Sequence, residues 1–257
     1  MITATSRSSP FPVPVRSASA ARVRSIDLHG PAGRLEAVLN EGSPHAAFAA
    51  VSAHPHPLGG GSLHNKVVYH AMKVMNASEW GFNFPVLRFN FRGTGLSEGV
   101  YDGAAEAGDV LAALAWIENE YKLPVAAAGF SFGAAMALKA CCAGTSLRGL
   151  KRETCGAPDR ELDMRALVAI GLPMRSGTSP VQLPSYDYSF VSRCTIPKLF
   201  LSGDRDQFAT KAEFIEAVAL AAEPKKMALV PGADHFFTGH LKRMQSTLAG
   251  WLKEQLS

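Results

Sequence analysis

The stretch Gly-Phe-Ser-Phe-Gly at residues 129–133 decides how this chain folds. It follows an apolar run at 124–128 that predicts a buried strand, and it precedes residues 134–140, which predict a helix. A serine on a strand-to-helix turn, with glycine two residues away on each side, is typical of a nucleophile elbow. Glycine is required because side chains at the flanking positions would collide with neighbouring backbone. The pattern predicts that Ser131 presents its hydroxyl from a strained turn, the alternative being a small-residue turn chosen for packing.

Two later segments supply partners for Ser131. A serine hydroxyl is a poor nucleophile until a base takes its proton. His235 follows a late apolar strand, and the apolar run at 198–203 is followed by two carboxylates, Asp204 and Asp206. The order serine, aspartate, histidine is that of the α/β-hydrolase arrangement. Each partner lies past the C-terminal end of a predicted strand, where open parallel sheets carry their functional loops.

As a set, these motifs resemble those of serine-type α/β-hydrolases, and most closely a small group of predicted hydrolases within that superfamily. The resemblance runs from about Ile26 to the C-terminus and says little about the substrate. It implies an α/β-hydrolase fold, with a mostly parallel twisted sheet of about eight strands, helices on both faces and a short cap. The motifs are His-Pro-His-Pro at 54–57, Gly-Gly-Gly at 59–61, His-Asn-Lys at 64–66, Arg-Phe-Asn-Phe-Arg-Gly at 88–93 with Gly95 and Ser97, the elbow at 129–133, Gly-Asp-Arg-Asp at 203–206 and Gly-Ala-Asp-His-Phe-Phe at 232–237.

The resemblance also suggests where an oxyanion would bind. In the superfamily a His-Gly-x-Pro sequence commonly ends the strand that corresponds to residues 46–53 here, and its residue x supplies a backbone N–H to the oxyanion hole. Residues 54–57 fit this pattern, with proline in the glycine position. Because proline has no N–H, His56 is the donor expected from the loop. The N–H of Phe132 is the second expected donor. The alternatives are a metal site at His54, His56 and His64, for which no cysteine or carboxylate completes a recognisable spacing, and a phosphate loop, for which the Walker order is absent.

The acid that orients His235 remains a choice between two residues. The superfamily usually places it three residues after the glycine that ends the strand, which favours Asp206 over Asp204. Asp234 is a weaker candidate because adjacent residues on an extended segment usually point apart. Asp102 and Asp109 are interpreted as a turn residue and a solvated helix residue.

The remaining segments alternate between strand and helix patterns, as expected for a mostly parallel sheet covered on both faces. We expect one domain at residues 25–257, with no repeat. Its cap, at 173–197, is short and contains Tyr186, Tyr188 and Phe190, so a large lid is not expected. Further strands are predicted at 23–29, 34–40, 46–53, 85–91, 166–172, 198–202 and 225–230, and helices at 65–80, 104–121, 208–222 and 241–256.

The composition agrees with a globular enzyme and shows no excess of basic residues, typical of nucleic-acid binding, in the part expected to fold. Of 257 residues, 47% are hydrophobic and 19% charged, and no apolar run is long enough to span a membrane. The formal charge of +4 resides in four arginines before Asp27, since the rest of the chain has 22 basic residues against 22 acidic ones. Residues 1–24 predict a disordered tail, or alternatively an organellar transit peptide because they are rich in arginine and serine and lack acids.

The four cysteines, Cys141, Cys142, Cys155 and Cys194, show no metal spacing. Adjacent Cys141 and Cys142 are interpreted as packing residues on one helix, so we expect a reduced, intracellular chain, most simply cytoplasmic. We expect no cofactor, no metal, and no nucleic-acid or membrane partner; the expected partner is a small acyl substrate.

The sequence therefore predicts a serine esterase or thioesterase, with Ser131, Asp206 and His235 as the catalytic residues and His56 and Phe132 N–H groups as the oxyanion hole. A peptidase or acyltransferase with the same residues, or a non-catalytic binding protein of this fold, are the alternatives.

Overall fold

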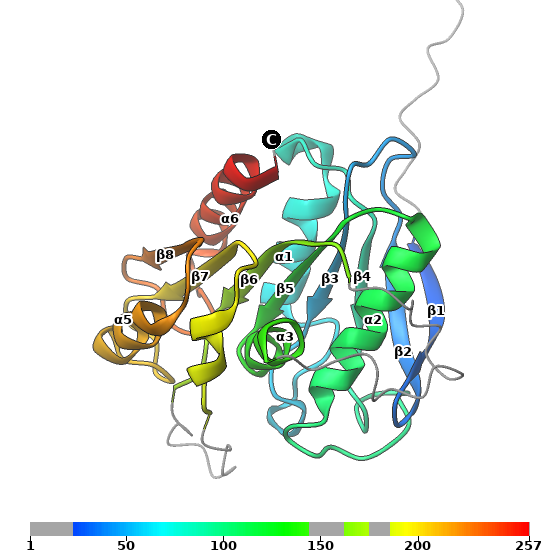
Figure 1. Cartoon of the computed structure of the whole chain (residues 1–257), viewed down its shortest axis with the longest axis horizontal. Coiled ribbons are helices and arrows are strands. Elements are labelled where there is room, and N and C mark those ends of the chain that lie inside the picture. The colour runs from blue at the N-terminus through cyan, green and yellow to red at the C-terminus, as the bar shows by residue number, and fades with distance from the viewer. Residues whose placement is uncertain (1–22, 144–161, 175–185, 257) are drawn as a thin grey trace, which may run out of the picture.

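The computed structural model describes residues 23–143, 162–174 and 186–256. These residues form an eight-stranded sheet in the order β1-β2-β4-β3-β5-β6-β7-β8, in which β1, β2 and β4 pair antiparallel and the other neighbours pair parallel (Figure 1). The expected mostly parallel sheet of about eight strands is confirmed. The strands are β1 (Val23–Gly30), β2 (Gly33–Asn40), β3 (Ala49–Ala53), β4 (Val86–Phe89), β5 (Val125–Phe130), β6 (Met164–Ile170), β7 (Lys198–Gly203) and β8 (Lys225–Val230).

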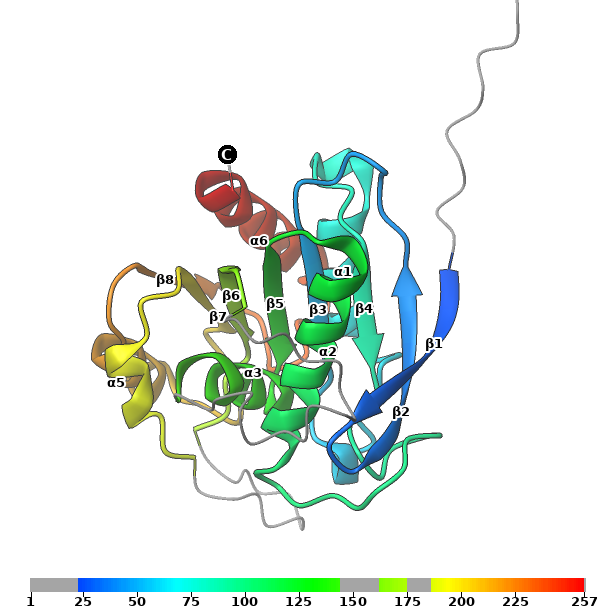
Figure 2. The ribbon, with the colours of Figure 1, turned by 45° about the vertical axis from the view of Figure 1, so that its right-hand side comes forward.

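Helices cover both faces of this sheet, and Figures 1 and 2 show α2 and α3 in front of it. The central strands are apolar along their whole length because both of their faces are covered. In β5, Val125 and Ala127 pack toward α2 and α3, whereas Ala126 and Ala128 pack toward α1 and α6. The helices are η1 (Pro57–Gly59), α1 (Lys66–Asn76), η2 (Ser78–Trp80), α2 (Glu106–Tyr121), α3 (Phe132–Cys142), η4 (Ser189–Arg193), α5 (Lys211–Leu220) and α6 (Leu241–Leu256).

Two helices are shorter than their sequence pattern predicts, and local hydrogen bonds explain both. The segment expected as one helix at 65–80 stops at Asn76, whose side-chain amide donates to the carbonyls of Glu41 and Phe84 at 3.0 and 2.8 Å. In the segment expected as a helix at 208–222, α5 begins only after Thr210. There Thr210 and Glu213 form a reciprocal capping box, which satisfies otherwise unpaired N–H groups of the first turn.

A buried ion pair holds the loop after β4 against α2. The Arg92 guanidinium donates to Asp109 at 2.6 and 3.0 Å, and the Asp109 side chain is fully buried. The interpretation of Asp109 as a solvated helix residue is therefore wrong. Asp109 lies on the buried face of α2, where its carboxylate accepts hydrogen bonds from Arg92.

A disulfide joins Cys142 to Cys194, with a Cα–Cα distance of 4.9 Å. The interpretation of Cys142 as a packing residue in a fully reduced chain is therefore wrong. The spacing of the cysteines does not indicate this bond, because its two partners are 52 residues apart in the sequence. Cys141 is free and packs against the core on the α2–α3 side. Cys155 lies outside the described residues, as do residues 1–22 of the expected tail and residues 175–185 of the expected cap.

Replacing Asp109 with alanine is expected to destabilise the protein by about 3–5 kcal/mol, because it leaves the Arg92 guanidinium buried without its counter-ion. The measurement is urea unfolding followed by circular dichroism. Asp27→Ala is the matched control, since the Asp27–Arg34 pair is exposed and such pairs contribute about 0–1 kcal/mol. Equal losses in the two variants would contradict this assignment.

Candidate active site

The turn between β5 and α3 has the strained geometry that its glycines predict. Ser131 has φ 54° and ψ −119°, a conformation that side-chain-bearing residues rarely adopt. A Cβ on Gly129 would collide with the carbonyl of Gly133, and one on Gly133 would lie 2.5 Å from the carbonyl oxygen of Ala53. The turn can therefore form only with glycine at both positions.

The structure brings together the three side chains expected to act as one unit. The Ser131 hydroxyl lies 3.0 Å from Nε2 of His235, and Nδ1 of His235 lies 2.8 Å from Oδ2 of Asp206. All three residues are buried: Ser131 and Asp206 are 8% exposed and His235 is 2% exposed. With the proton on Nδ1, the imidazole donates to Asp206 and accepts from Ser131.

Asp206 is held in place by two further donors. The Ser202 hydroxyl donates to its Oδ2 at 3.1 Å, and the Phe208 N–H donates to its Oδ1 at 2.8 Å. The ring of Phe208 in turn contacts the His235 ring, with centroids 4.4 Å apart. The carboxylate therefore has a fixed orientation and faces His235.

The other two aspartates near this point bond to backbone. Asp204 accepts from the Gly232 N–H at 2.6 Å, and Asp234 accepts from the Thr238 N–H at 2.8 Å. Asp204 thus ties the loop after β7 to the loop after β8, and hydrogen bonding to Thr238 helps to lower the pKa of Asp234 against the opposing effect of burial.

His56 and Phe132, the two expected oxyanion donors, lie side by side. Their rings are 5.1 Å apart, and neither backbone N–H donates a hydrogen bond to another part of the chain that the structure describes. The carbonyl of His56 accepts from the N–H groups of Gly59 and Gly61, which closes the loop into a compact turn. This arrangement leaves two N–H donors available next to the elbow.

Tyr101 is a neighbour of this site that the sequence reasoning missed. Its hydroxyl bonds to Nε2 of His56 at 2.8 Å, and its ring contacts that of Phe132 at 5.8 Å. Burial lowers the pKa of His56 and raises the pKa of Tyr101 to about 12, so both are neutral near pH 7. No motif marks Tyr101, because it belongs to an irregular loop before α2.

His54 anchors the start of the oxyanion loop. Its Nε2 accepts from the Phe91 N–H at 3.0 Å, so its Nδ1–H is the donor to the carbonyl of Pro55 at 2.6 Å. Desolvation lowers its pKa to about 4. Both ring nitrogens are therefore engaged in joining the ends of β3 and β4, and within the described residues no group of three metal-binding side chains occurs.

Comparison with known proteins identifies the fold family. The family description "Alpha/beta hydrolase domain" matches residues 66–256. The chain belongs to the alpha/beta hydrolases.

Individual proteins similar to this alpha/beta hydrolase support the assignment to the family. It is 33% identical over 221 residues to an uncharacterised protein of Rickettsia prowazekii, covering 82% of this chain and 81% of that one. A serine hydrolase without a lid from Xanthomonas campestris is similar in structure, with a TM-score of 0.69, 26% identity and coverage of 92% and 95% of the two chains. A serine hydrolase homologue from Coxiella burnetii has a TM-score of 0.69 at 27% identity, covering 92% of this chain and 100% of that one.

The buried His54 should make the stability depend on pH. Because the pKa of His54 in the folded protein, about 4, lies below the usual histidine value of 6.5, its contribution to the unfolding free energy is complete above pH 6.5 and is lost as the pH falls toward 4. Between pH 7 and pH 4.5, wild type should lose about 2 kcal/mol more unfolding free energy than His54→Gln.

The measurement is urea unfolding at both pH values, and His64→Gln, a change at an exposed histidine, is the control. An identical pH response in wild type and His54→Gln would show that His54 is not the group that titrates.

Proposed function

We propose that this alpha/beta hydrolase is a serine hydrolase that cleaves an ester or thioester of a small acyl substrate through an acyl-enzyme. The observation that carries the proposal is the continuous hydrogen-bonded chain from Ser131 through His235 to Asp206. It is the geometry that a nucleophile, its base and the group orienting that base require.

In this mechanism the Ser131 oxygen attacks the acyl carbonyl while His235 Nε2 takes its proton. The same nitrogen then gives the proton to the leaving group. Asp206 accepts from Nδ1–H throughout, which fixes the tautomer and stabilises the imidazolium as it forms. Water, deprotonated by His235, then attacks the acyl-enzyme and releases the acid, and Ser131 recovers its proton.

The oxyanion hole in this proposal consists of the N–H groups of His56 and Phe132. Charge develops on the carbonyl oxygen only when the tetrahedral intermediate forms, so two donors with no other partner among the described residues stabilise it without prior rearrangement. Tyr101 supports the His56 side through its hydroxyl. No cofactor and no metal enters this scheme.

The small size proposed for the acyl group rests on the short segment between β6 and β7. A cap of this length leaves the site open to small acyl groups, and the similar Xanthomonas campestris hydrolase is described as having no lid. A peptidase or an acyltransferase would use the same residues and is distinguished only by substrate. The complete hydrogen-bonded set of Ser131, His235 and Asp206 argues against a non-catalytic binding protein, which has no need of all three residues.

Within the described residues, no helix is long and apolar enough to cross a membrane. Residues 25–257 as a single domain, and a cytoplasmic location or an organellar one if residues 1–24 are a transit peptide, stay predictions.

Ser131→Ala is expected to abolish covalent labelling by a fluorophosphonate and to lower ester hydrolysis on the order of 10⁶-fold, by comparison with another serine hydrolase. The assay uses p-nitrophenyl esters and acyl-CoA thioesters of increasing chain length. Ser246→Ala, at an exposed serine of α6, is the control. Labelling of Ser131→Ala at the wild-type rate would place the nucleophile elsewhere.

Asp206→Asn is expected to fold normally and to lose about 10⁴-fold in kcat, because the asparagine amide favours the wrong imidazole tautomer. Asp204→Asn is the matched control: it weakens one bond to the Gly232 N–H, which should leave most of the activity and cost about 1 kcal/mol of stability at most. Kinetics on one ester, with circular dichroism of both variants, decides between them. The reverse result would make Asp204 the orienting acid.

A further inference from the structure

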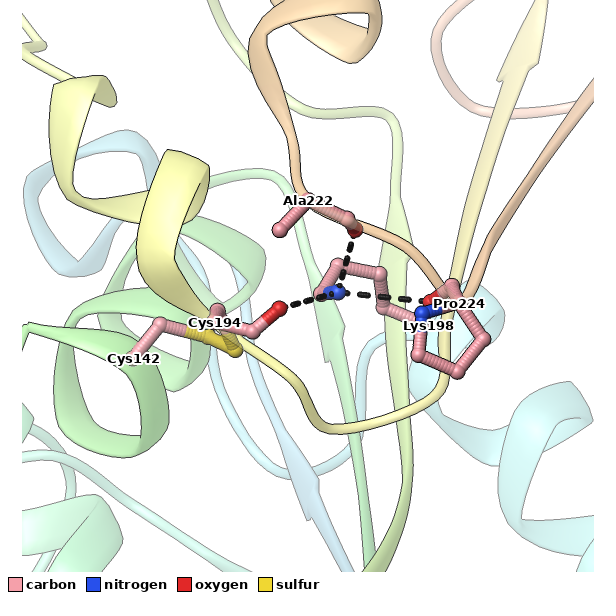
Figure 3. Close-up of a disulfide and its surroundings, with 5 residues drawn as sticks. All are labelled: Cys142, Cys194, Lys198, Ala222 and Pro224. Carbon is pink, nitrogen blue, oxygen red and sulfur yellow. Dashed lines mark hydrogen bonds between the residues drawn. A yellow bond between two sulfur atoms is a disulfide. The ribbon is translucent and has the colours of Figure 1, made fainter.

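The Cys142–Cys194 disulfide connects the helix that carries the nucleophile to the segment between β6 and β7 (Figure 3). Cys142 is the last residue of α3, which begins immediately after Ser131, and Cys194 follows η4. A covalent bond therefore joins the far end of the helix that follows Ser131 to an element from another part of the chain.

Cys194 is also held by a hydrogen bond that does not depend on the disulfide. Lys198, buried at 1% exposure, donates from Nζ to the carbonyls of Cys194, Ala222 and Pro224 at 2.7, 2.9 and 3.3 Å. Figure 3 shows this ammonium among the three carbonyl groups. Cleavage of the disulfide would leave the Cys194 backbone bound to Lys198, so the two thiols would stay close enough to pair again.

The bridged segment is connected to His235 through a series of direct contacts. The Tyr188 hydroxyl, at the start of η4, donates to the carbonyl of Pro173 at 2.8 Å. Next along the chain, the Met174 N–H donates to the carbonyl of Phe208 at 2.9 Å. Phe208 donates to Asp206 and packs its ring on His235. These contacts therefore lead from η4 to Asp206 and Phe208, which both contact the imidazole.

The neighbouring Cys141 does not compete for the bond. Like Cys142 it is only partly exposed, but it packs against the core, and burial raises the pKa of its thiol to about 12, so almost none of it is thiolate at neutral pH. Cys142 is partly exposed, whereas Cys194 is 4% exposed. An external thiolate would therefore attack the sulfur of Cys142, with Cys194 as the leaving group.

We propose that Cys142–Cys194 is a thiol-exchange site at which a dithiol reductant removes the covalent link between η4 and α3 and thereby weakens the positioning of His235. The reductant's thiolate attacks Cys142, forms a mixed disulfide and expels Cys194 as a thiolate, which takes up a proton. The second thiolate of the reductant then attacks its own sulfur in the mixed disulfide and releases Cys142, which is protonated. The protein gains two electrons and two protons, and the reductant becomes a disulfide.

The experiment compares the oxidised and the dithiothreitol-reduced full-length protein in a Cys155→Ala background, which leaves Cys141 as the one cysteine outside the pair. Peptide mass mapping verifies the Cys142–Cys194 pair. Reduction should lower the melting temperature by about 10 °C and lower kcat about tenfold with little change in KM. Oxidised glutathione should restore both values.

Three variants define the specificity of this effect. Cys142→Ala and Cys194→Ala should behave like the reduced protein and should no longer respond to dithiothreitol, whereas Cys141→Ala should respond like wild type. A fall in melting temperature with unchanged kcat would overturn the proposal, because the bond would then be a structural staple only. Absence of the Cys142–Cys194 peptide from the oxidised protein would also overturn it.

The effect on turnover rests on the proposed function, so a readout independent of hydrolysis is included. The NMR resonances of the His235 ring, assigned with His235→Gln, should shift on reduction and return on reoxidation. If Ser131 proves unreactive but these resonances shift, the proposed function fails and the exchange site stands. If the resonances do not move, the exchange site is rejected whatever the activity.

Discussion

The active site depends on a steric constraint at one turn, where the backbone of Ser131 adopts a positive φ between β5 and α3. That turn forms only because Gly129 and Gly133 have no side chains to meet the carbonyls beside them. The strain is maintained by the surrounding packing, since β5 is the fully buried centre of the sheet. It aims the hydroxyl at His235, and the Phe132 N–H beside it has no helical partner because it opens α3. One local conformation thus prepares both the nucleophile and a donor for the charge it generates.

The sequence was sufficient for those features that short-range chemistry determines. The apolar strands, the elbow glycines and the order of Ser131, Asp206 and His235 predicted the parallel sheet and the residues at its carboxyl edge. The distinction between Asp206 and Asp204 came from the spacing after Gly203, and the contacts of the two residues differ accordingly: one faces His235 and the other bonds to the Gly232 N–H.

The features that sequence reasoning missed are those created by contacts between distant segments. Asp109 reads as an ordinary helix carboxylate until the loop after β4 brings Arg92 to it. The Cys142–Cys194 bond depends on where η4 lies against α3, which cysteine spacing does not reveal. Tyr101 has no periodicity to mark it, since a loop side chain acquires its role only from the His56 nitrogen that it meets. Shortened helices had a similar origin, in bonds made by Asn76 and Thr210.

Both edges of the sheet are charged, and this bears on self-association. On β1, Arg24 forms ion pairs with Glu41 and Glu120, and on β8 the exposed Lys226 pairs with Glu254. A second copy that extended the sheet at either edge would have to strip water from these groups, because its strand would lie about 4.8 Å away. Among the described residues the outer edges of these two strands have no strand partner, and the charged groups make them a poor template for another chain. The sheet is thus completely buried at its centre, whereas the charges on its edge strands β1 and β8 disfavour edge-to-edge pairing with a second copy.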